Sequence, residues 1–206
     1  MNKETPSAEP QAGNEKDKNE HEQIKPRIVF SRCLGFESCR YNGQMVRDEF
    51  VEELKPFAEV ITICPEGDIG MGVPRDPVRV VKEGERLHLY QPATEKDWTE
   101  EMESFCASAI EGFSGIDGFV LKSRSPTCGF KDVKIYRGYE PSGGHEKGSG
   151  FFGGAVAEAL PGIPAEDEGR LRNWAIRDHF LTRVYTLARY RTSVSPSASA
   201  LTDFHG

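Results

Sequence analysis

RIVFSRC, residues 27–33, is the stretch that decides the fold, because it is a run of β-branched and aromatic residues that stops at a glycine-containing turn. Two later stretches share this character: VITICP at residues 60–65 and GFVLK at residues 118–122. Short apolar runs bounded by turn residues are typical of strands buried inside a parallel sheet. These three stretches therefore predict the central strands of the domain.

Helical patterns fill the connections between these strands. Apolar residues recur at helical spacing over residues 45–55 and 94–113, and Thr94 is the expected N-cap of the second helix. Residues 66–85 are rich in Gly, Pro, Asp and Arg, which predicts a long functional loop. Further strands are expected at residues 87–92 and 133–136, and further helices at 151–160 and 170–191. Strands that alternate with helices predict an α/β domain of three layers with a mostly parallel sheet.

The 206 residues are enough for one ordinary domain. Residues 1–26 and residues 192–206 are polar and lack the apolar side chains of a core, so we expect disordered tails on both sides of a domain at residues 27–191. No stretch has the apolar run of a signal peptide or a membrane span. The sequence therefore predicts a soluble, cytoplasmic protein.

A net charge of −7 argues against a protein that coats nucleic acid through a globally basic surface. A local basic patch is still possible in the expected C-terminal helix, where arginines alternate with aromatic residues. One interpretation is an amphipathic helix that packs its aromatic side chains on the core, and the other is a surface for tRNA or another partner. The arginines are Arg170, Arg172, Arg177, Arg183, Arg189 and Arg191.

The glycines of residues 137–154 partly match a nucleotide-binding motif. Gly148, Gly150 and Gly153 have the spacing of a dinucleotide fingerprint. The segment does not follow the first strand, however, and no acidic residue ends a second strand after it. We therefore expect a loop that caps the helix at 151–160.

Five cysteines in a chain without a secretion signal argue against a disulfide framework and for metal-binding or catalytic thiols. Cys33, Cys64 and Cys128 each lie at or just beyond the end of a predicted strand. Because the carboxyl ends of parallel strands meet at one edge of a sheet, these thiols are expected to converge. Three thiolates select zinc, copper(I) or an iron-sulfur cluster, and leave one coordination position open for chemistry. The alternative is that each cysteine is a small buried hydrophobic residue.

The other two cysteines are interpreted differently. Cys106 shares a helical face with Trp98, Met102 and Phe105, which predicts a core residue. Cys39 follows Cys33 in the same loop and is close enough to be an auxiliary thiol, although no strand end directs it to the site.

Three segments together resemble the thiouracil desulfidase family: SRCLGFESCRYNG (31–43), CPEGDIGMGVPRDPVR (64–79) and LKSRSPTCGFKDVKIY (121–136). The resemblance implies a Rossmann-like fold that binds a 4Fe-4S cluster through Cys33, Cys64 and Cys128. It also implies removal of sulfur from a thiolated uracil, which leaves the carbonyl and releases sulfide. Longer relatives suggest tRNA 4-thiouridine as the substrate, whereas a single-domain form suits a free base or nucleoside.

The resemblance also implies two catalytic residues, Glu66 and Ser125. An iron with an open position would act as a Lewis acid toward the thiocarbonyl sulfur. Glu66 would take a proton from the attacking water, and Ser125 would donate a hydrogen bond to the ring or the developing oxyanion. The alternatives are that Glu66 pairs with Arg75 or Arg79, and that Ser125 is only a turn residue before a proline.

The first motif departs from the commoner family form at two positions, which looks like a subfamily variant. Phe36 stands where the commoner motif has glycine, and Cys39 stands where it has an apolar residue. A second function remains open at this stage, a non-catalytic sensor module that binds a metal or cluster through three cysteines. Glu66 and Ser125 distinguish the two functions, because a sensor needs no proton-transferring pair beside an open metal position.

Overall fold

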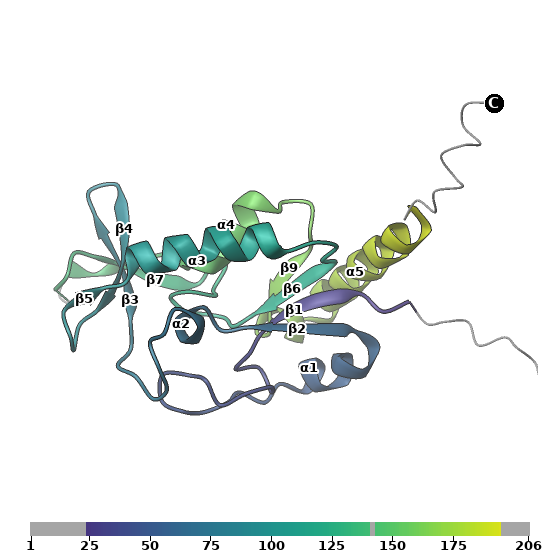
Figure 1. Cartoon of the computed structure of the whole chain (residues 1–206), viewed down its shortest axis with the longest axis horizontal. Helices are drawn as coiled ribbons and strands as arrows, with labels where there is room; N and C mark the ends of the chain where they lie inside the picture. Colours follow the sequence, from purple (N-terminus) through teal and green to yellow (C-terminus); the bar gives the residue numbers. More distant parts are fainter. Residues whose placement is uncertain (1–23, 141–142, 195–206) are drawn as a thin grey trace, which may run out of the picture.

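The computed structural model describes residues 24–140 and 143–194 of the chain (Figure 1). The predicted disordered tails lie outside the described residues, apart from residues 24–26 and 192–194. Residues 24–26 run into the first strand, where the carbonyl of Pro26 accepts a hydrogen bond from Glu59 N–H. Residues 192–194 extend the last helix.

A parallel four-stranded sheet forms the centre of the molecule, with strand order β2-β1-β6-β9. The three strands expected from the apolar runs are all present, and β9 joins them at one edge. The apolar side chains of β1 are completely buried, because this strand has a neighbour on each side and helices above and below. The strands are β1 (Arg27–Ser31), β2 (Glu59–Ile63), β6 (Gly118–Leu121) and β9 (Ala165–Asp167).

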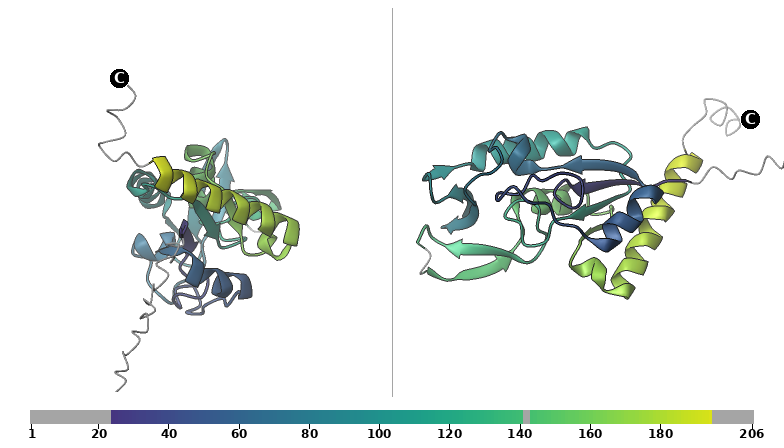
Figure 2. Two further views of the ribbon diagram at one scale, coloured as in Figure 1. Left: turned by 90° about the vertical axis from the view of Figure 1, so that its right-hand side faces the viewer. Right: turned by 90° about the horizontal axis from the view of Figure 1, so that it is seen from below.

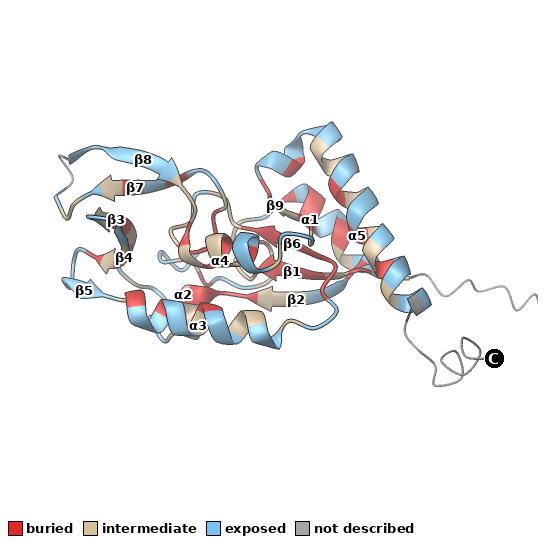
Figure 3. Ribbon diagram, turned by 90° about the horizontal axis from the view of Figure 1, so that it is seen from above, coloured by how far each residue is buried: buried red, intermediate tan, exposed pale blue. Residues whose placement is uncertain are grey.

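Helices cover both faces of this sheet (Figures 1 and 2). On one face α3 (Thr99–Gly112) and α4 (Phe151–Ala159) pack in a core cluster that includes Cys106, as predicted. On the other face α1 (Glu49–Leu54) and α5 (Trp174–Val194) pack in a second cluster. Figure 3 shows the buried residues concentrated in β1, in β6 and on the helix sides that face them. The predicted three-layer, Rossmann-like α/β fold is confirmed.

A second sheet lies beyond the carboxyl ends of the parallel strands (Figure 1), and the sequence did not predict it as a separate unit. Its strand order is β5-β4-β3-β7-β8, and only the β3–β7 pair is parallel. The strands are β3 (Arg79–Glu83), β4 (Arg86–Gln91), β5 (Lys96–Asp97), β7 (Val133–Arg137) and β8 (His145–Gly148). The prediction of a continuous loop was wrong over β3, because its apolar signal is only Val80 and Val81 between charged residues.

Three predicted helix starts are also wrong. The C-terminal helix, expected from residue 170, begins at Trp174, because Arg170–Arg172 form a separate 3₁₀ turn that ends at the extended residue Asn173. The other two starts differ for local reasons. The first helix begins at Glu49 rather than at residue 45, because Val46 forms a bridge with Leu34 and the Asp48 side chain accepts a hydrogen bond from Val51 N–H. The second helix begins at Thr99, since the preceding residues form β5.

The expected N-cap of the second helix, Thr94, belongs to a turn instead. Its hydroxyl donates to the Gln91 side chain at 2.8 Å. The N-cap position is Trp98, whose side chain makes no capping hydrogen bond, and the Asp97 carboxylate before it accepts a hydrogen bond from Thr99 N–H at 2.9 Å.

Most arginines of the C-terminal segment make contacts within the fold. Phe180 and Val184 of α5 are buried against the parallel sheet, which agrees with a packing helix. Trp174 and Tyr190, in contrast, are 74% and 64% exposed. The contacts are Arg170 with Glu166, Arg177 over the Phe50 ring, Arg183 with the Gly162 carbonyl and Arg191 with Asp117. No described helix has both the length and the apolar character to cross a membrane.

The glycines that partly match a dinucleotide fingerprint have a packing role in this fold. A Cβ atom at Gly153 would lie 2.5 Å from the Gly129 carbonyl oxygen and 2.6 Å from that of Cys128. A Cβ atom at Gly150 would lie 2.6 Å from the Pro126 carbonyl oxygen. The bare backbone at these two positions lets the start of α4 lie directly on the loop that carries Cys128. Backbone hydrogen bonds from residues 150, 151 and 153 to this loop complete the contact.

Replacing Gly153 with alanine should destabilise the protein by about 1–3 kcal/mol, because the new methyl group overlaps backbone atoms that cannot rotate away. Chemical unfolding of the variant measures this loss. Gly112→Ala is the control, since a Cβ at that helical position would meet nothing within 4 Å. The control should be neutral or slightly stabilising. Equal stability of Gly153→Ala and the wild type would show that α4 does not need this close approach.

Candidate active site

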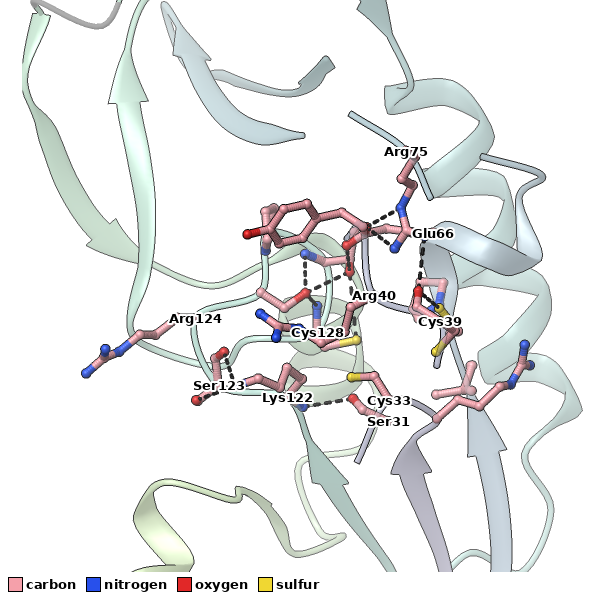
Figure 4. A pocket seen from close by; sticks show the side chains of 18 residues that line it. Ser31, Cys33, Cys39, Arg40, Glu66, Arg75, Lys122, Ser123, Arg124 and Cys128 are labelled. Atoms are coloured by element: carbon pink, nitrogen blue, oxygen red, sulfur yellow. Dashed lines mark hydrogen bonds and ion pairs between the residues drawn. The ribbon is translucent and has the colours of Figure 1, made fainter. Parts of the chain in front are cut away.

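The three cysteines predicted as ligands meet at the carboxyl edge of the parallel sheet. Cys33 follows β1, Cys64 follows β2 and Cys128 follows β6. The register places Ser31 beside Ile63, the last residues of β1 and β2, so the two chains leave the sheet at the same level. All three cysteines line one cavity of about 310 Å³, which Figure 4 shows from close by. The structure thus brings together the thiols that the sequence placed at separate strand ends.

The loops that carry Cys33 and Cys64 are tied to each other. Arg32 donates a hydrogen bond of 2.8 Å to the carboxylate of Asp68, in the short helix α2 (Pro65–Asp68). The same carboxylate accepts a hydrogen bond from Cys64 N–H at 3.1 Å. Asp68 therefore fixes the backbone at Cys64 and holds the residue that precedes Cys33.

A fourth thiol, Cys39, also lines the cavity. It is 2% exposed, and its carbonyl oxygen accepts a hydrogen bond from the Cys64 thiol at 3.8 Å. Its carbonyl oxygen accepts a hydrogen bond from Arg75 at 3.1 Å, which holds this part of the loop over the site. The position of Cys39 could not be predicted, because it lies in a loop whose path depends on contacts with distant residues.

Hydrogen bonds and burial raise the pKa of three thiols of the site, those of Cys39, Cys64 and Cys128. The hydrogen bond with Cys33, together with burial, raises the pKa of Cys39 to about 11. The hydrogen bond with Cys39 and then burial also raise the pKa of Cys64. Burial raises the pKa of Cys128 to about 12. Because thiolates are the metal-binding form, a metal centre that binds here would displace protons from these thiols.

Glu66 lies on the cavity wall and is held from two sides. Its Oε2 atom accepts hydrogen bonds from Arg75 Nε at 2.8 Å and Arg75 Nη2 at 2.5 Å. Its Oε1 atom accepts a hydrogen bond from the Thr127 hydroxyl at 3.0 Å. The side chains of Glu66 and Arg75 are 12% and 4% exposed, so this is a nearly buried ion pair. Of the two pairings considered from the sequence, the structure contains the one with Arg75.

Arg79, the other candidate partner of Glu66, lies in the second sheet. Its guanidinium group stacks over the rings of Tyr90 and Tyr136 and donates a hydrogen bond to the Tyr139 carbonyl. It therefore stabilises the packing of β3, β4 and β7 rather than the carboxylate of the site.

Ser125 lines the same cavity but also shapes its own turn. Its oxygen accepts hydrogen bonds from Cys128 N–H at 3.1 Å and Thr127 N–H at 3.3 Å. It lies 3.0 Å from the Thr127 hydroxyl oxygen. The turn role considered from the sequence is thus present, together with a position from which the hydroxyl faces the cavity.

Lys122, which sequence reasoning did not single out, brings a buried charge pair to the cavity edge. Its ammonium group lies 2.5 Å from the carboxylate of Glu168, a residue 5% exposed. Ser123 donates to the same carboxylate through its N–H at 2.7 Å and its hydroxyl at 2.6 Å. Burial would raise the pKa of Glu168, but the hydrogen bonds from Lys122 and Ser123 outweigh it and lower the pKa. The pair ties the end of β6 to the residue after β9.

The donor set fits an iron-sulfur cluster. Four soft thiols from three separate loops surround a cavity instead of gathering at one point, and thiolates are the ligands of such clusters. In the described part of the chain, no three His, Cys, Asp or Glu side chains form a site for a single metal ion. The Thr127 hydroxyl oxygen lies 3.8 Å from Cys128 Sγ, and the Cys39 carbonyl oxygen lies 3.8 Å from Cys64 Sγ.

Comparisons with known proteins point to one family. Residues 28–168 match a family described as 2-thiouracil desulfurase. The chain is 30% identical over 148 residues to the uncharacterised protein YbbK of Bacillus subtilis (strain 168), a match that covers 68% of this chain and 96% of that protein. It also resembles the solved structure of a 4Fe-4S-dependent thiouracil desulfidase, TudS, with a TM-score of 0.57 and 28% identity over 75% of this chain and 99% of that one.

Proposed function

Because the chain belongs to the 2-thiouracil desulfurase family, we propose that it is a 4Fe-4S-dependent desulfidase that acts on a thiolated uracil compound. Cys33, Cys64 and Cys128 bind the cluster, and Glu66 and Ser125 act beside it. In the reaction the thiocarbonyl and one water become the carbonyl and hydrogen sulfide, so no oxidant or reductant is consumed. The observation that carries the proposal is the cavity that three strand-end cysteines share with Glu66 and Ser125.

The cluster, when bound, supplies a Lewis-acidic iron that polarises a thiocarbonyl sulfur. The chain supplies the proton acceptor and the orientation of the reacting groups. Glu66 takes a proton from the attacking water at the carboxylate oxygen that Thr127 now contacts, while Arg75 keeps hold of the other oxygen. Ser125 turns its hydroxyl hydrogen toward the oxygen that forms on the ring carbon.

The shape and charge of the site bear on the form of the substrate. The cavity of about 310 Å³ is at the small end of ligand pockets and has to hold the cluster as well as the substrate, which favours a small compound. Arg40 and Arg124 also line it, and neither has an ion-pair partner within the described ranges. Arg124 points outward, away from the cysteines (Figure 4). We propose a free thiolated base or a nucleoside as the substrate. If the nucleoside carries a 5′-phosphate, this group would lie at the rim of the cavity.

A tRNA substrate has less support from the C-terminal segment. Four of its six arginines already bind groups within this chain. The groups that could still contact a large partner are the exposed Trp174 and the remaining arginines, Arg172 and Arg189. 4-Thiouridine in tRNA therefore stays as the second substrate to be tested.

The test is reconstitution of the purified protein without oxygen, followed by measurement of iron, acid-labile sulfide and loss of the thiocarbonyl absorbance. The substrates compared are 2-thiouracil, 4-thiouracil, 4-thiouridine with and without a 5′-phosphate, and thiolated tRNA. We expect about four irons per chain at full loading and sulfide release in proportion to carbonyl formation. A protein that takes up only zinc, or one that holds a cluster without consuming any thiocarbonyl, would disprove the proposed enzyme.

A further inference from the structure

Thr127 links the two proposed catalytic residues. Its side chain is almost completely buried, with the residue 1% exposed, so its hydroxyl cannot turn to solvent. On one side it lies 3.0 Å from the Ser125 hydroxyl, and on the other it lies 3.0 Å from Glu66 Oε1. The three side chains therefore form a continuous row along the cavity wall.

The direction of the hydrogen bonds in this row follows from the number of donors and acceptors. A serine oxygen has two acceptor positions and one hydrogen to donate. The N–H groups of Thr127 and Cys128 occupy both acceptor positions of Ser125. Ser125 must therefore donate its hydrogen to Thr127, whose own single hydrogen then goes to the Glu66 carboxylate at 3.0 Å rather than to Cys128 Sγ at 3.8 Å.

The backbone fixes the position of Thr127 in this row. The carbonyl oxygen of Thr127 accepts a hydrogen bond from Gly153 N–H at 3.0 Å, and that of Pro126 accepts one from Phe151 N–H at 3.2 Å. The start of α4 thus holds the turn from behind. Arg75 holds Glu66 from the far side. Because α4 holds the turn and Arg75 holds Glu66, the Thr127 hydroxyl is well placed to set the direction of the two side chains between them.

We propose that Thr127 is a positioning residue of the reaction, whose hydroxyl orients the Glu66 carboxylate and holds the Ser125 hydroxyl in place until Ser125 turns its hydrogen to the substrate. The inference rests on the proposed desulfidase function. Thr127 touches neither the substrate nor the iron in this role, and it acts through its two neighbours. Removing its hydroxyl leaves Glu66 Oε1 without its donor and the Ser125 hydrogen without its acceptor, so both side chains lose their defined directions.

Two substitutions test this role in the cluster-loaded protein. Thr127→Val keeps the shape and removes the hydroxyl, whereas Thr127→Ser keeps the hydroxyl. Because misplaced reacting groups lower the rate by up to about 100-fold, kcat of Thr127→Val should fall about 10- to 100-fold while KM changes far less. Thr127→Ser should recover most of kcat. Iron content and the visible spectrum should match the wild type in both variants.

The control and a double variant separate positioning from general damage. Thr99→Val removes another buried hydroxyl, one that hydrogen-bonds far from the cavity, and should leave kcat unchanged. In a Ser125→Ala background, Thr127→Val should add little further loss, because the two residues act as a unit. Independent, multiplicative losses, or a Thr127→Val enzyme with wild-type kcat, would overturn the proposal.

An infrared measurement makes the result independent of turnover. The difference between the loaded wild type and Glu66→Gln identifies the carboxylate band of Glu66. This band should shift in Thr127→Val and stay in place in Thr127→Ser, and an unshifted band in Thr127→Val would overturn the hydrogen-bonded row. If the band shifts in Thr127→Val but the wild type consumes no thiocarbonyl, the hydrogen-bonded row is upheld and the desulfidase function is disproved.

Discussion

Replacing Cys128 with alanine should abolish iron binding and activity, whereas replacing Cys106 with alanine should leave both unchanged. Both cysteines are 5% exposed and both have a pKa raised to about 12 by burial, so they are closely matched as buried thiols. They differ in position, since Cys128 lines the cavity and Cys106 packs in the core between α3 and α4. Iron and sulfide analysis after anaerobic reconstitution makes the comparison.

The same substitution at Cys33 and at Cys64 should also abolish activity, because each supplies one of three ligands. Cys39→Ala is expected to keep the cluster, since three ligands remain. Its thiol lines the same cavity as the three proposed ligands, so this variant tests whether a fourth cysteine is needed. Full iron retention in Cys128→Ala, or loss of iron in Cys106→Ala, would contradict the assignment of the ligands.

Replacing Glu66 with glutamine should lower kcat by about 10²- to 10⁴-fold while the cluster remains bound, because positioned acid-base groups contribute rate factors of that size. Glutamine keeps the length of the side chain and an oxygen for Arg75, so the buried guanidinium group still has an acceptor. What is lost is the ability to accept a proton from water. Single-turnover measurements of thiocarbonyl loss, with iron analysis of the same sample, test this result.

The control for Glu66 is Glu37→Gln, which neutralises a carboxylate next to the first ligand loop. The Glu37 side chain is 60% exposed and lies 3.7 Å from Arg32, so the pair contributes little. This control should retain full activity. A Glu66→Gln enzyme as fast as the wild type would remove Glu66 from the proton transfer, whatever the behaviour of the cysteines.

The convergence of the three cysteines could be predicted because it depends only on sheet topology. An apolar run marks a central strand, and the residue after it must lie at the carboxyl edge. The second sheet could not be predicted in the same way. Its strand β3 has two apolar residues, Val80 and Val81, and its remaining stability comes from pairing with β4 and β7, which are distant in the chain or separated by a turn.

The contacts within the site could not be predicted either, because they depend on residues that are distant in the chain. Cys39 reaches the cavity because the chain folds back through the Leu34–Val46 bridge and because Arg75 binds its carbonyl. The choice between Arg75 and Arg79 as partner of Glu66 likewise depends on the second sheet, which claims Arg79. Thr127 could have been singled out from the sequence, because it is a second hydroxyl-bearing residue between Ser125 and Cys128. Only the structure shows that its hydroxyl connects Ser125 with Glu66.

The order of the sheet has a consequence for how the protein matures. The proposed ligands come from three adjacent strands, and the last of them is held by glycine contacts with α4, so residues 33–153 must all be in place before the ligands can meet. A partly synthesised chain therefore offers no complete ligand set. We expect cofactor delivery to act on the finished domain, and iron retention to report the integrity of the whole sheet.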